Sequence, residues 1–533
     1  MKRMITGLLA LCMVLTMFAG CAAQPQTPET TAQSAAPAPA PEVAPTVAAQ
    51  EAPAAPKYVF LFIGDGMSYP QFQAAADYLG AIADDDYEKA LPSTKSDTRE
   101  GAVLDGPVAL NFMGFEVAGS AVTYDSCSFA PDSASTATSI ATGKKTYSGM
   151  INVDESGATP YETIAEKLHA QKGWKVGVIS SVNLNHATPA AFYAHQASRN
   201  NYYEIGEELV NSGFEYFAGG GLKKVTGPDK DKTSLYDLAE AAGYKVTYTQ
   251  AEAEAITAAD QKVILIDEHL ADSDAMDYDM DRSDGEWALA DYVAKGIEVL
   301  NNDTGFFMMC EGGKIDWACH ANDAGATVTD TLALADAVQV AVDFAKEHPD
   351  ETLILVTGDH ETGGLTIGYA ATNYDTFLDS LARQTISYAK FDTDYVAGYV
   401  ASQTAFADAM ADVKACFGLT LPTDPDASAD DVLTLTEWEA EQLEYAYRRT
   451  LETGAAAQAD MTQADYEKFG TYQPFSMEIC HQIARKSGVG HTTYAHTGAP
   501  VALYAIGCGA EQFNGAYDNT EIYKKLAALT GVE

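Results

Sequence analysis

The sequence predicts an α/β fold with a mainly parallel central sheet and helices on both of its faces. Two observations support this fold class: short, apolar, β-rich runs recur along the chain, and helical patterns lie between them. A third observation concerns the ends of these runs, several of which carry carboxylate or imidazole side chains. Because ligands of such sheets bind at the carboxyl ends of the strands, we expect the functional site there.

The N-terminal segment has the features of an export signal. Lys2 and Arg3 precede an apolar run, and small residues precede Cys21, which predicts a signal peptide over residues 1–20. The ending Phe-Ala-Gly-Cys resembles a bacterial lipobox. We therefore expect a lipid on Cys21 that anchors an exported protein to the membrane, at the cell surface or in the periplasm. An ordinary signal peptide and a secreted protein are the alternative.

The next segment has the composition of a linker. Residues 22–56 contain 13 Ala and 8 Pro and no aromatic residue, so they cannot bury a hydrophobic core. We expect a lipid-anchored, disordered tether over residues 21–56. No later apolar run is long enough to predict a membrane-spanning helix.

The chain is strongly acidic. Its 533 residues include 76 Asp and Glu against 32 Lys and Arg, which gives a formal net charge of −44 at pH 7. A surface of this charge repels the phosphates of nucleic acids and of anionic lipids, which argues against nucleic-acid binding through a basic patch. A phosphate-binding site in this protein therefore needs metal ions or a buried arginine.

The alternating elements begin with an apolar run over 58–63, which a Gly-Asp-Gly sequence ends. Similar runs predict strands over 174–180, 262–267, 305–311, 352–360 and 501–507, and helical patterns include 161–171 and 333–348. Residues 366–475 break this alternation and contain helical patterns such as 435–452. We interpret them as an insertion that caps or flanks the site, within a domain formed by residues 57–365 and 476–533.

A stretch of small residues surrounds Asp132 and Ser133. Either side chain could cap a helix, because its oxygen can accept a hydrogen bond from an exposed backbone N–H. Alternatively, Ser133 is a nucleophile at a helix N-terminus, where N–H groups and the helix dipole favour an anion such as phosphate. The stretch alone favours the cap, so the other segments have to decide.

Four segments carry candidate metal ligands, which are Asp65; Glu311, Asp316 and His320; Asp359 and His360; and His491 and His496. Asp316 and His320 are four residues apart, so on a helix they share one face and can reach the same ion. Carboxylate and imidazole ligands without thiolates suit a catalytic zinc ion that keeps an open position. Asp359 and His360 follow an apolar strand, so both can emerge at its end.

The motifs together resemble those of the alkaline phosphatases. The motifs occur in the same order as in that family, and they are IGDGM, DSASTAT, HATPAA, SRN, EGGKID with its following His, TGDH and HTG. The resemblance covers most of residues 57–365 and about 476–533, and it does not obviously extend to 366–475. It implies an alkaline phosphatase-like fold in which the two matching parts form the catalytic domain and a large insertion lies near the active site.

The resemblance implies a role for each matching residue. Ser133 would be the nucleophile that becomes phosphorylated, and Arg199 would bind the phosphate oxygens. Two zinc ions and one magnesium ion would be held by three sets of ligands, which are Asp316, His320 and His496 for the first zinc ion, Asp65, Asp359 and His360 for the second, and Asp65, Thr188 and Glu311 for magnesium. The expected reaction is hydrolysis of phosphate monoesters to an alcohol and inorganic phosphate, and the family implies a homodimer.

Three positions need separate treatment. His186 stands where some family members have Asp and others His, and we place it near the magnesium site rather than on it. Trp317 stands where some members have a Lys that helps to hold phosphate, so we expect weaker phosphate binding, unless Trp317 only packs against the insertion. His491 competes with His496 for the first zinc ion, and the HTG motif favours His496.

Two other functions are open alternatives. One is a related metal-dependent phosphodiesterase or sulfatase, but Arg199 favours a dianionic monoester and the segment around Ser133 lacks the Cys-x-Pro-x-Arg signature of a sulfatase. The other is a tethered, non-catalytic binder of metal or phosphate, against which the complete set of nucleophile, ligands and arginine argues. We therefore predict a metal-dependent phosphomonoesterase that releases phosphate from small molecules outside the cytoplasm.

Overall fold

The computed structural model describes residues 55–90, 103–454 and 461–533. The predicted signal peptide and almost all of the predicted tether lie outside the described residues, so the lipid on Cys21 stays a prediction. In the described ranges, no helix combines the length and the apolar character that crossing a membrane requires.

A ten-stranded sheet forms the centre of the molecule, in the order β14-β2-β13-β8-β1-β7-β3-β4-β6-β5. In that order the strands are Gly515–Asp518, Val117–Val122, Val501–Gly507, Thr352–Gly358, Tyr58–Gly64, Phe306–Gly312, Lys175–Ser180, Tyr216–Gly219, Val263–Ile266 and Lys245–Thr247. Strand β13 runs antiparallel to both of its neighbours, β8 and β2, and all other pairs are parallel. The predicted mainly parallel sheet is therefore confirmed.

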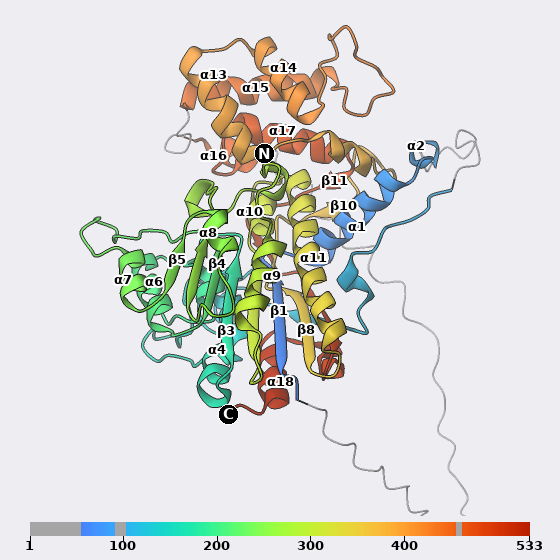
Figure 1. Ribbon diagram of the computed structural model, residues 1–533. Coiled ribbons are helices and arrows are strands. Elements are labelled where there is room, and N and C mark those ends of the chain that lie inside the picture. The colour runs from blue at the N-terminus through green and yellow to red at the C-terminus, as the bar shows by residue number, and fades with distance from the viewer. Residues whose placement is uncertain (1–54, 91–102, 455–460) are drawn as a thin grey trace, which may run out of the picture. The chain divides into compact units, whose positions relative to one another are not determined.

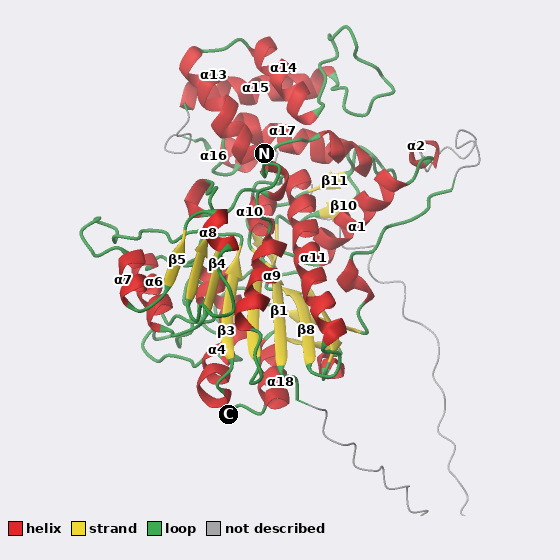
Figure 2. Ribbon diagram, in the orientation of Figure 1, coloured by secondary structure: helices red, strands yellow, loops and turns green. Residues whose placement is uncertain are grey.

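Helices cover both faces of this sheet, because each central strand is apolar on both sides. Along β1, alternate residues enter two separate cores: Phe60 and Phe62 lie in one, and Val59, Leu61 and Ile63 lie in the other. The first core is closed by α1 (Tyr69–Ala83), α9 (Leu289–Leu300) and α11 (Ala324–Glu347), and α9 and α11 cross the near face of the strands in Figures 1 and 2. The second core is closed by α3 (Ser133–Thr142), α4 (Ile164–Lys167), α6 (Tyr202–Asn211), α7 (Leu235–Ala241) and α18 (Thr520–Thr530).

Ten further helices and two small strand pairs complete the list of these elements in the described residues. The helices are α2 (Tyr87–Ala90), α5 (Ala187–Ala190), α8 (Gln250–Glu254), α10 (Lys314–His320), α12 (Tyr388–Phe391), α13 (Ala397–Ser402), α14 (Phe406–Phe417), α15 (Glu437–Thr453), α16 (Gln463–Phe469) and α17 (Pro474–Lys486). Two small pairs join β9 (Glu361–Thr362) to β12 (His496–Thr497) and β10 (Thr366–Ile367) to β11 (Val489–Gly490).

The predicted insertion is mainly helical in its described part. Helices α13, α14 and α15 lie together beyond α17 in Figure 1, and α17 packs against α11, α12, α14, α15 and α16. Because α17 starts at Pro474, it crosses the predicted boundary between 475 and 476. The domain limits drawn from the sequence stay a prediction.

The sequence located the strands better than the helices. All six predicted strands lie within two residues of β1, β3, β6, β7, β8 and β13. The helix predicted over 333–348 is only the second half of α11, which begins at Ala324 after an Asp323 cap. The first five residues of α11 are all buried, so this half has no polar face and no helical periodicity in its sequence.

Candidate active site

Three adjacent strands bring polar side chains to one edge of the sheet. Gly64 at the end of β1 pairs with Gly312 of β7 on one side and with Gly358 of β8 on the other. Asp65 therefore emerges next to Glu311 and Asp359, as the apolar runs and their polar ends predicted. A Cβ on Gly358 would lie 1.9 Å from the carbonyl oxygen of Met67, so only glycine fits where the two strand ends pass each other.

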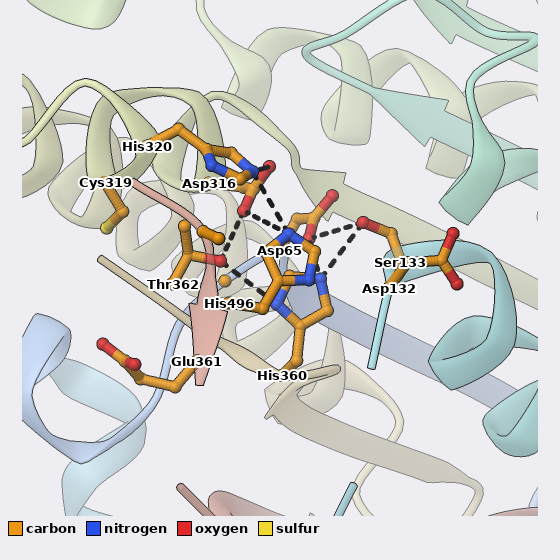
Figure 3. Close-up of polar contacts among 12 residues, drawn as sticks. Asp65, Asp132, Ser133, Asp316, Cys319, His320, His360, Glu361, Thr362 and His496 are labelled. Atoms are coloured by element: carbon orange, nitrogen blue, oxygen red, sulfur yellow. Dashed lines mark hydrogen bonds and ion pairs between the residues drawn. The ribbon is translucent and has the colours of Figure 1, made fainter. Parts of the chain in front are cut away.

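Ser133 is the first residue of α3, and its side chain points into this edge (Figure 3). Its Oγ lies 3.1 Å from His360 Nε2 and 3.5 Å from Asp65 Oδ1, and the residue is 1% exposed. Asp132 caps the helix, because its carboxylate accepts a hydrogen bond of 3.1 Å from the backbone N–H of Ser135. The two interpretations of this stretch thus apply to different residues, with Asp132 as the cap and Ser133 at the cluster.

A first group of ligand atoms surrounds Asp316. Its Oδ2 lies 3.3 Å from His320 Nε2, and its Oδ1 lies 3.7 Å from His496 Nε2. The two Nε2 atoms are 3.1 Å apart. The Nδ1 atoms of both histidines face backbone carbonyls at 2.6 Å, those of Tyr494 and Pro131, to which they donate as N–H groups. In the neutral imidazoles, both Nε2 atoms therefore carry no proton and can bind a metal ion.

A second group consists of Asp65, Asp359 and His360, which are completely buried. His360 Nε2 lies 3.1 Å from Asp65 Oδ1 and 3.4 Å from Asp359 Oδ2. Asp359 is held from the other side by Thr136 Oγ1, which donates to its Oδ2 at 3.0 Å. The ring of His360 stacks on that of His496 at a centroid distance of 3.7 Å, so the first two groups adjoin.

The third group consists of Asp65, His186 and Glu311. Thr188 Oγ1 donates to Asp65 Oδ2 at 3.4 Å, and Ser180 Oγ donates to Glu311 Oε2. Glu311 Oε1 is buried and has no hydrogen-bond partner among the described residues. A cation with oxygen ligands would satisfy this carboxylate, so the donor set fits a magnesium ion.

His186 enters this group as a neutral imidazole that accepts a hydrogen bond from Arg199. Its Nε2 lies 3.2 Å from Arg199 Nη2, which can only donate, so the proton of the imidazole is on Nδ1. Burial lowers the pKa of His186 to about 3, and the neighbouring guanidinium of Arg199 adds to the shift. His186 is thus a member of the third group itself, whereas the sequence placed it near the magnesium site rather than on it.

The carboxylates of the cluster lie closer together than isolated anions tolerate. Burial and the neighbouring carboxylates raise the pKa of Asp65 and of Asp359 well above the usual value, and that of Glu311 to about 8. Burial acts in the same direction on Asp316, but His320 and His496 outweigh it and hold its pKa well below the usual value. Bound divalent cations would neutralise the repulsion among these carboxylates, so the site favours metal binding.

Arg199 is held beside the nucleophile by a partly buried ion pair. Its Nη1 lies 2.9 Å from Asp132 Oδ2, and its backbone N–H donates to Gly149 at 2.7 Å. Burial raises the pKa of Asp132, but the guanidinium outweighs this effect and the net shift is downward. The same carboxylate that caps α3 therefore also orients the predicted phosphate-binding arginine.

The remaining predicted residues lie around this cluster. Trp317 packs edge-on against His186, with ring centroids 6.0 Å apart. His491 belongs to none of the three groups of ligand atoms, and burial lowers its pKa to about 3. The geometry thus favours His496 over His491, as the HTG motif did.

Sequence reasoning missed Thr362. Its Oγ1 donates to Asp316 Oδ1 at 2.6 Å and lies 3.2 Å from His360 Nδ1 (Figure 3). Thr362 therefore orients one ligand of the first group and one ligand of the second. The only sequence signal was its position two residues after His360. The contact with Asp316 joins residues 46 positions apart and could not be read from spacing.

The comparisons with known proteins agree with this geometry. A family model for alkaline phosphatase matches residues 56–532. The chain belongs to the alkaline phosphatase family. Family membership makes it a phosphatase enzyme that depends on metal ions, and it removes the non-catalytic binder from the alternatives.

Alkaline phosphatases of known sequence and structure are similar over most of the chain. Alkaline phosphatase 3 of Bacillus subtilis (strain 168) is 32% identical over 402 residues, which cover 74% of this chain and 76% of that protein. Alkaline phosphatase 4 of the same organism is 29% identical over 399 residues, covering 73% and 74%. The crystal structure of a cold-active alkaline phosphatase from Shewanella sp. is 27% identical with a TM-score of 0.68, covering 89% of this chain and 99% of that chain. The alkaline phosphatase-like fold is therefore confirmed.

Proposed function

We propose that this alkaline phosphatase hydrolyses phosphate monoesters through a phosphoserine at Ser133, with two zinc ions and one magnesium ion. The observation that carries the proposal is the position of Ser133 Oγ, which lies 3.1 Å from His360 Nε2 at the start of a helix. The N-terminus of α3 favours the negative charge of a phosphate group. No other serine of the predicted site motifs has this combination of neighbours.

The distances among these side chains support the proposed assignment of the ions. Asp316, His320 and His496 would hold the first zinc ion, Asp65, Asp359 and His360 the second, and Asp65, Thr188 and Glu311 the magnesium ion. Mixed imidazole and carboxylate ligands suit zinc, whereas carboxylate and hydroxyl oxygens suit magnesium. When bound, the zinc ions supply positive charge that lowers the pKa of the Ser133 hydroxyl and stabilises the entering and leaving oxygens.

The side chains of the chain then divide the remaining work. Ser133 Oγ forms a bond to phosphorus while the bond from phosphorus to the alcohol oxygen breaks. Arg199 binds two oxygens of the phosphate, and Asp132 holds the guanidinium in the required orientation. Water then attacks phosphorus, phosphate leaves, and the Ser133 hydroxyl is restored.

Trapping the intermediate tests the proposal. The enzyme is mixed with p-nitrophenyl phosphate, quenched in acid within milliseconds and digested, and its peptides are analysed by mass spectrometry. We expect a phosphate group on the peptide that contains Ser133. A phosphate on another residue, or none during steady turnover, would contradict the phosphoserine mechanism.

Arg199→Ala is expected to lower kcat/KM for p-nitrophenyl phosphate by about 10²-fold to 10³-fold, because the phosphate loses its bidentate donor. The inhibition constant of inorganic phosphate should rise as well, since the same oxygens are bound in the product. Both constants follow from steady-state kinetics. Arg199→Lys should be intermediate, and Arg282→Ala, which removes an arginine paired with Asp279, should change neither constant. Equal effects at the two arginines would contradict the phosphate-binding role.

Trp317→Lys is expected to strengthen inhibition by inorganic phosphate, because an ammonium group would be added beside the phosphate position. Phosphate inhibition of the wild type and the variant, measured at the same pH and metal content, tests this. An unchanged inhibition constant would leave Trp317 with only a packing role, such as its contact with His186.

Three further proposals concern the setting of the enzyme. We propose export, a lipid on Cys21 and a homodimer, which rest on the N-terminal sequence and on the family. Metabolic labelling with palmitate in a bacterial host, with Cys21→Ala as the control, tests the lipid. Light scattering of the purified enzyme tests the dimer.

A further inference from the structure

A cavity of about 870 Å³ lies between the catalytic part and the insertion. Four aromatic rings line it: Tyr278 and Trp317 come from the catalytic part, and Tyr388 and Tyr472 come from residues of the predicted insertion. Tyr278 and Tyr472 both pack edge-on against Tyr388, with ring centroids 6.0 Å and 5.7 Å away. The rings provide flat apolar surfaces of the kind that ligand pockets use.

Residues that line this cavity are neighbours of the proposed first zinc ligands, although no zinc ligand lines it. Trp317 directly follows Asp316, and burial together with the nearby charges of Tyr388 and Asp316 raises the pKa of Tyr472. Tyr472 also packs against Tyr494, whose carbonyl accepts the hydrogen bond from His320 Nδ1. In the proposed reaction, the alcohol leaves on this side of the phosphate, so the cavity is placed to bind the alcohol part of the substrate.

The Lys314 amine lies against aromatic rings at the cavity and, within the described part of the chain, makes no ion pair with a carboxylate. The residue is 2% exposed, and its Nζ lies 3.7 Å above the ring of Tyr278 and 5.0 Å from that of Trp317. Among the described residues, this amine makes no hydrogen bond or ion pair. The ring contacts leave its N–H groups without a hydrogen bond to the described residues, so the amine can donate to a ligand with an oxygen acceptor.

Carboxylates supply the opposite kind of hydrogen-bonding group. Five aspartates and two lysines line the cavity, and the second lysine, Lys390, is already paired with Asp394 at 3.1 Å. Asp277 and Asp281 face the cavity as acceptors, and Asp281 also accepts two hydrogen bonds from Ser387. The lining therefore combines a free donor, several acceptors and flat apolar faces.

The lining selects most strongly against anionic ligands, and Lys314 adds a local repulsion for a cation that approaches the rings. The aspartates repel an alcohol that carries further negative charge, and Lys314 repels one that carries an ammonium group. A neutral alcohol with several hydroxyl groups meets neither repulsion, because each hydroxyl can accept from Lys314 and donate to an aspartate. The C–H faces of a sugar ring can also pack on the aromatic rings.

We propose that this cavity binds the sugar of phosphorylated monosaccharides and makes them preferred substrates of the enzyme. The proposal rests on the phosphatase function proposed above and adds the class of alcohol. The decisive juxtaposition is the Lys314 amine, whose N–H groups make no hydrogen bond to any described residue, between aspartates and aromatic rings and near the metal ligands.

Lys314→Met and Lys314→Gln test the proposal in the full-length enzyme loaded with zinc and magnesium. The readout is the ratio of kcat/KM for glucose 6-phosphate to that for p-nitrophenyl phosphate. We expect the ratio to fall about tenfold in Lys314→Met, and by less in Lys314→Gln, because glutamine keeps a donor without the charge. Lys245→Met, at the far edge strand β5, should leave the ratio unchanged.

Charged substrates provide the other arms of the experiment. Wild type should prefer glucose 6-phosphate over ATP and over phosphorylethanolamine. A preference for phosphorylethanolamine that increases in Lys314→Met would overturn the proposal in favour of cationic alcohols. An unchanged sugar ratio in both Lys314 variants would overturn it altogether.

Binding without turnover separates this proposal from the proposed function. Methyl glucoside, which has no phosphate, should show saturation transfer from the wild-type enzyme in NMR spectra and a weaker signal with Lys314→Met. This result would stand even if no phosphoserine forms at Ser133. Turnover of p-nitrophenyl phosphate without any glucoside signal would leave the phosphatase function intact and refute the sugar site.

Discussion

Ser133→Ala is expected to lower kcat/KM for p-nitrophenyl phosphate at pH 9 by at least about 10³-fold. The variant lacks the oxygen that forms the bond to phosphorus, while the metal ligands and Arg199 stay in place. Activity that remains would come from direct attack of water. Steady-state kinetics with metal-loaded protein measure the loss, and the phosphopeptide described above should disappear.

Stability should change little in this variant. The Ser133 hydroxyl contacts only His360 and Asp65 at the cluster, and the start of α3 is capped by Asp132 rather than by Ser133. The melting temperature and the zinc content are therefore the internal controls, and Ser212→Ala at the end of α6 is the matched variant. Retention of more than about a tenth of the activity by correctly folded, metal-loaded Ser133→Ala would place the nucleophile elsewhere.

Removal of the metal ions is expected to abolish activity and to make the protein less stable as the pH rises. Without cations, the pKa of Glu311 in the folded protein is about 8, and the pKa values of Asp65 and Asp359 are also raised, above those in the unfolded chain. The folded state therefore binds more protons than the unfolded state, so the free energy of unfolding falls as these groups ionise. Bound divalent cations should remove this dependence.

The predicted decrease in the stability of the metal-free protein is best measured between pH 6.5 and pH 9. Burial also lowers the pKa of His186 and His496 to about 3, which has the opposite effect on stability, but only below the unfolded value of 6.5. The pKa of His320 is raised to about 9, because Asp316 outweighs the effect of burial, so it adds to the decrease within the window. Above pH 6.5, all shifted groups of the cluster that still titrate therefore act in the same direction.

Thermal melts at pH 6.5 and pH 9 test this prediction. They compare the chelated protein with protein that is loaded with both zinc and magnesium. We expect the difference in melting temperature between the two forms to widen by at least about 5 °C across the window. Glu311→Gln in the chelated form should reduce the widening, since one titrating carboxylate is gone. Restoring zinc should restore activity. Parallel melting curves across the window would show that the cluster is not held together by cations.

The strands and the polar residues at their ends could be predicted because both are local. A run such as 58–63 is apolar on both faces wherever it lies in a parallel sheet, and Asp65 must follow it at the sheet edge. The order of the motifs around Ser133, Asp316 and His360 was also present in the sequence. This order led to the family that the comparisons then showed.

Other features were not local and could not be predicted. The start of α11 has no amphipathic pattern, because all of its sides are buried. Thr362 becomes a partner of Asp316 only because the residues after β8 and the first turn of α10 lie at the same edge of the sheet. Lys314 stands in a motif next to the metal ligands, yet its burial among aromatic rings depends on Tyr278 and on the insertion.

The sequence by itself determined the α/β class, the family and the set of residues that meet at the carboxyl ends of β1, β7 and β8, because these follow from short patterns of side chains. Only the tertiary structure decided how those residues are used. In the tertiary structure, Asp132 both caps α3 and forms an ion pair with Arg199. The contact with Arg199 assigns the proton of His186 to Nδ1. His496, rather than His491, lies at the cluster of metal ligands. The physical reason is that protonation, orientation and burial depend on neighbours in space, and most of these neighbours lie far apart along the chain.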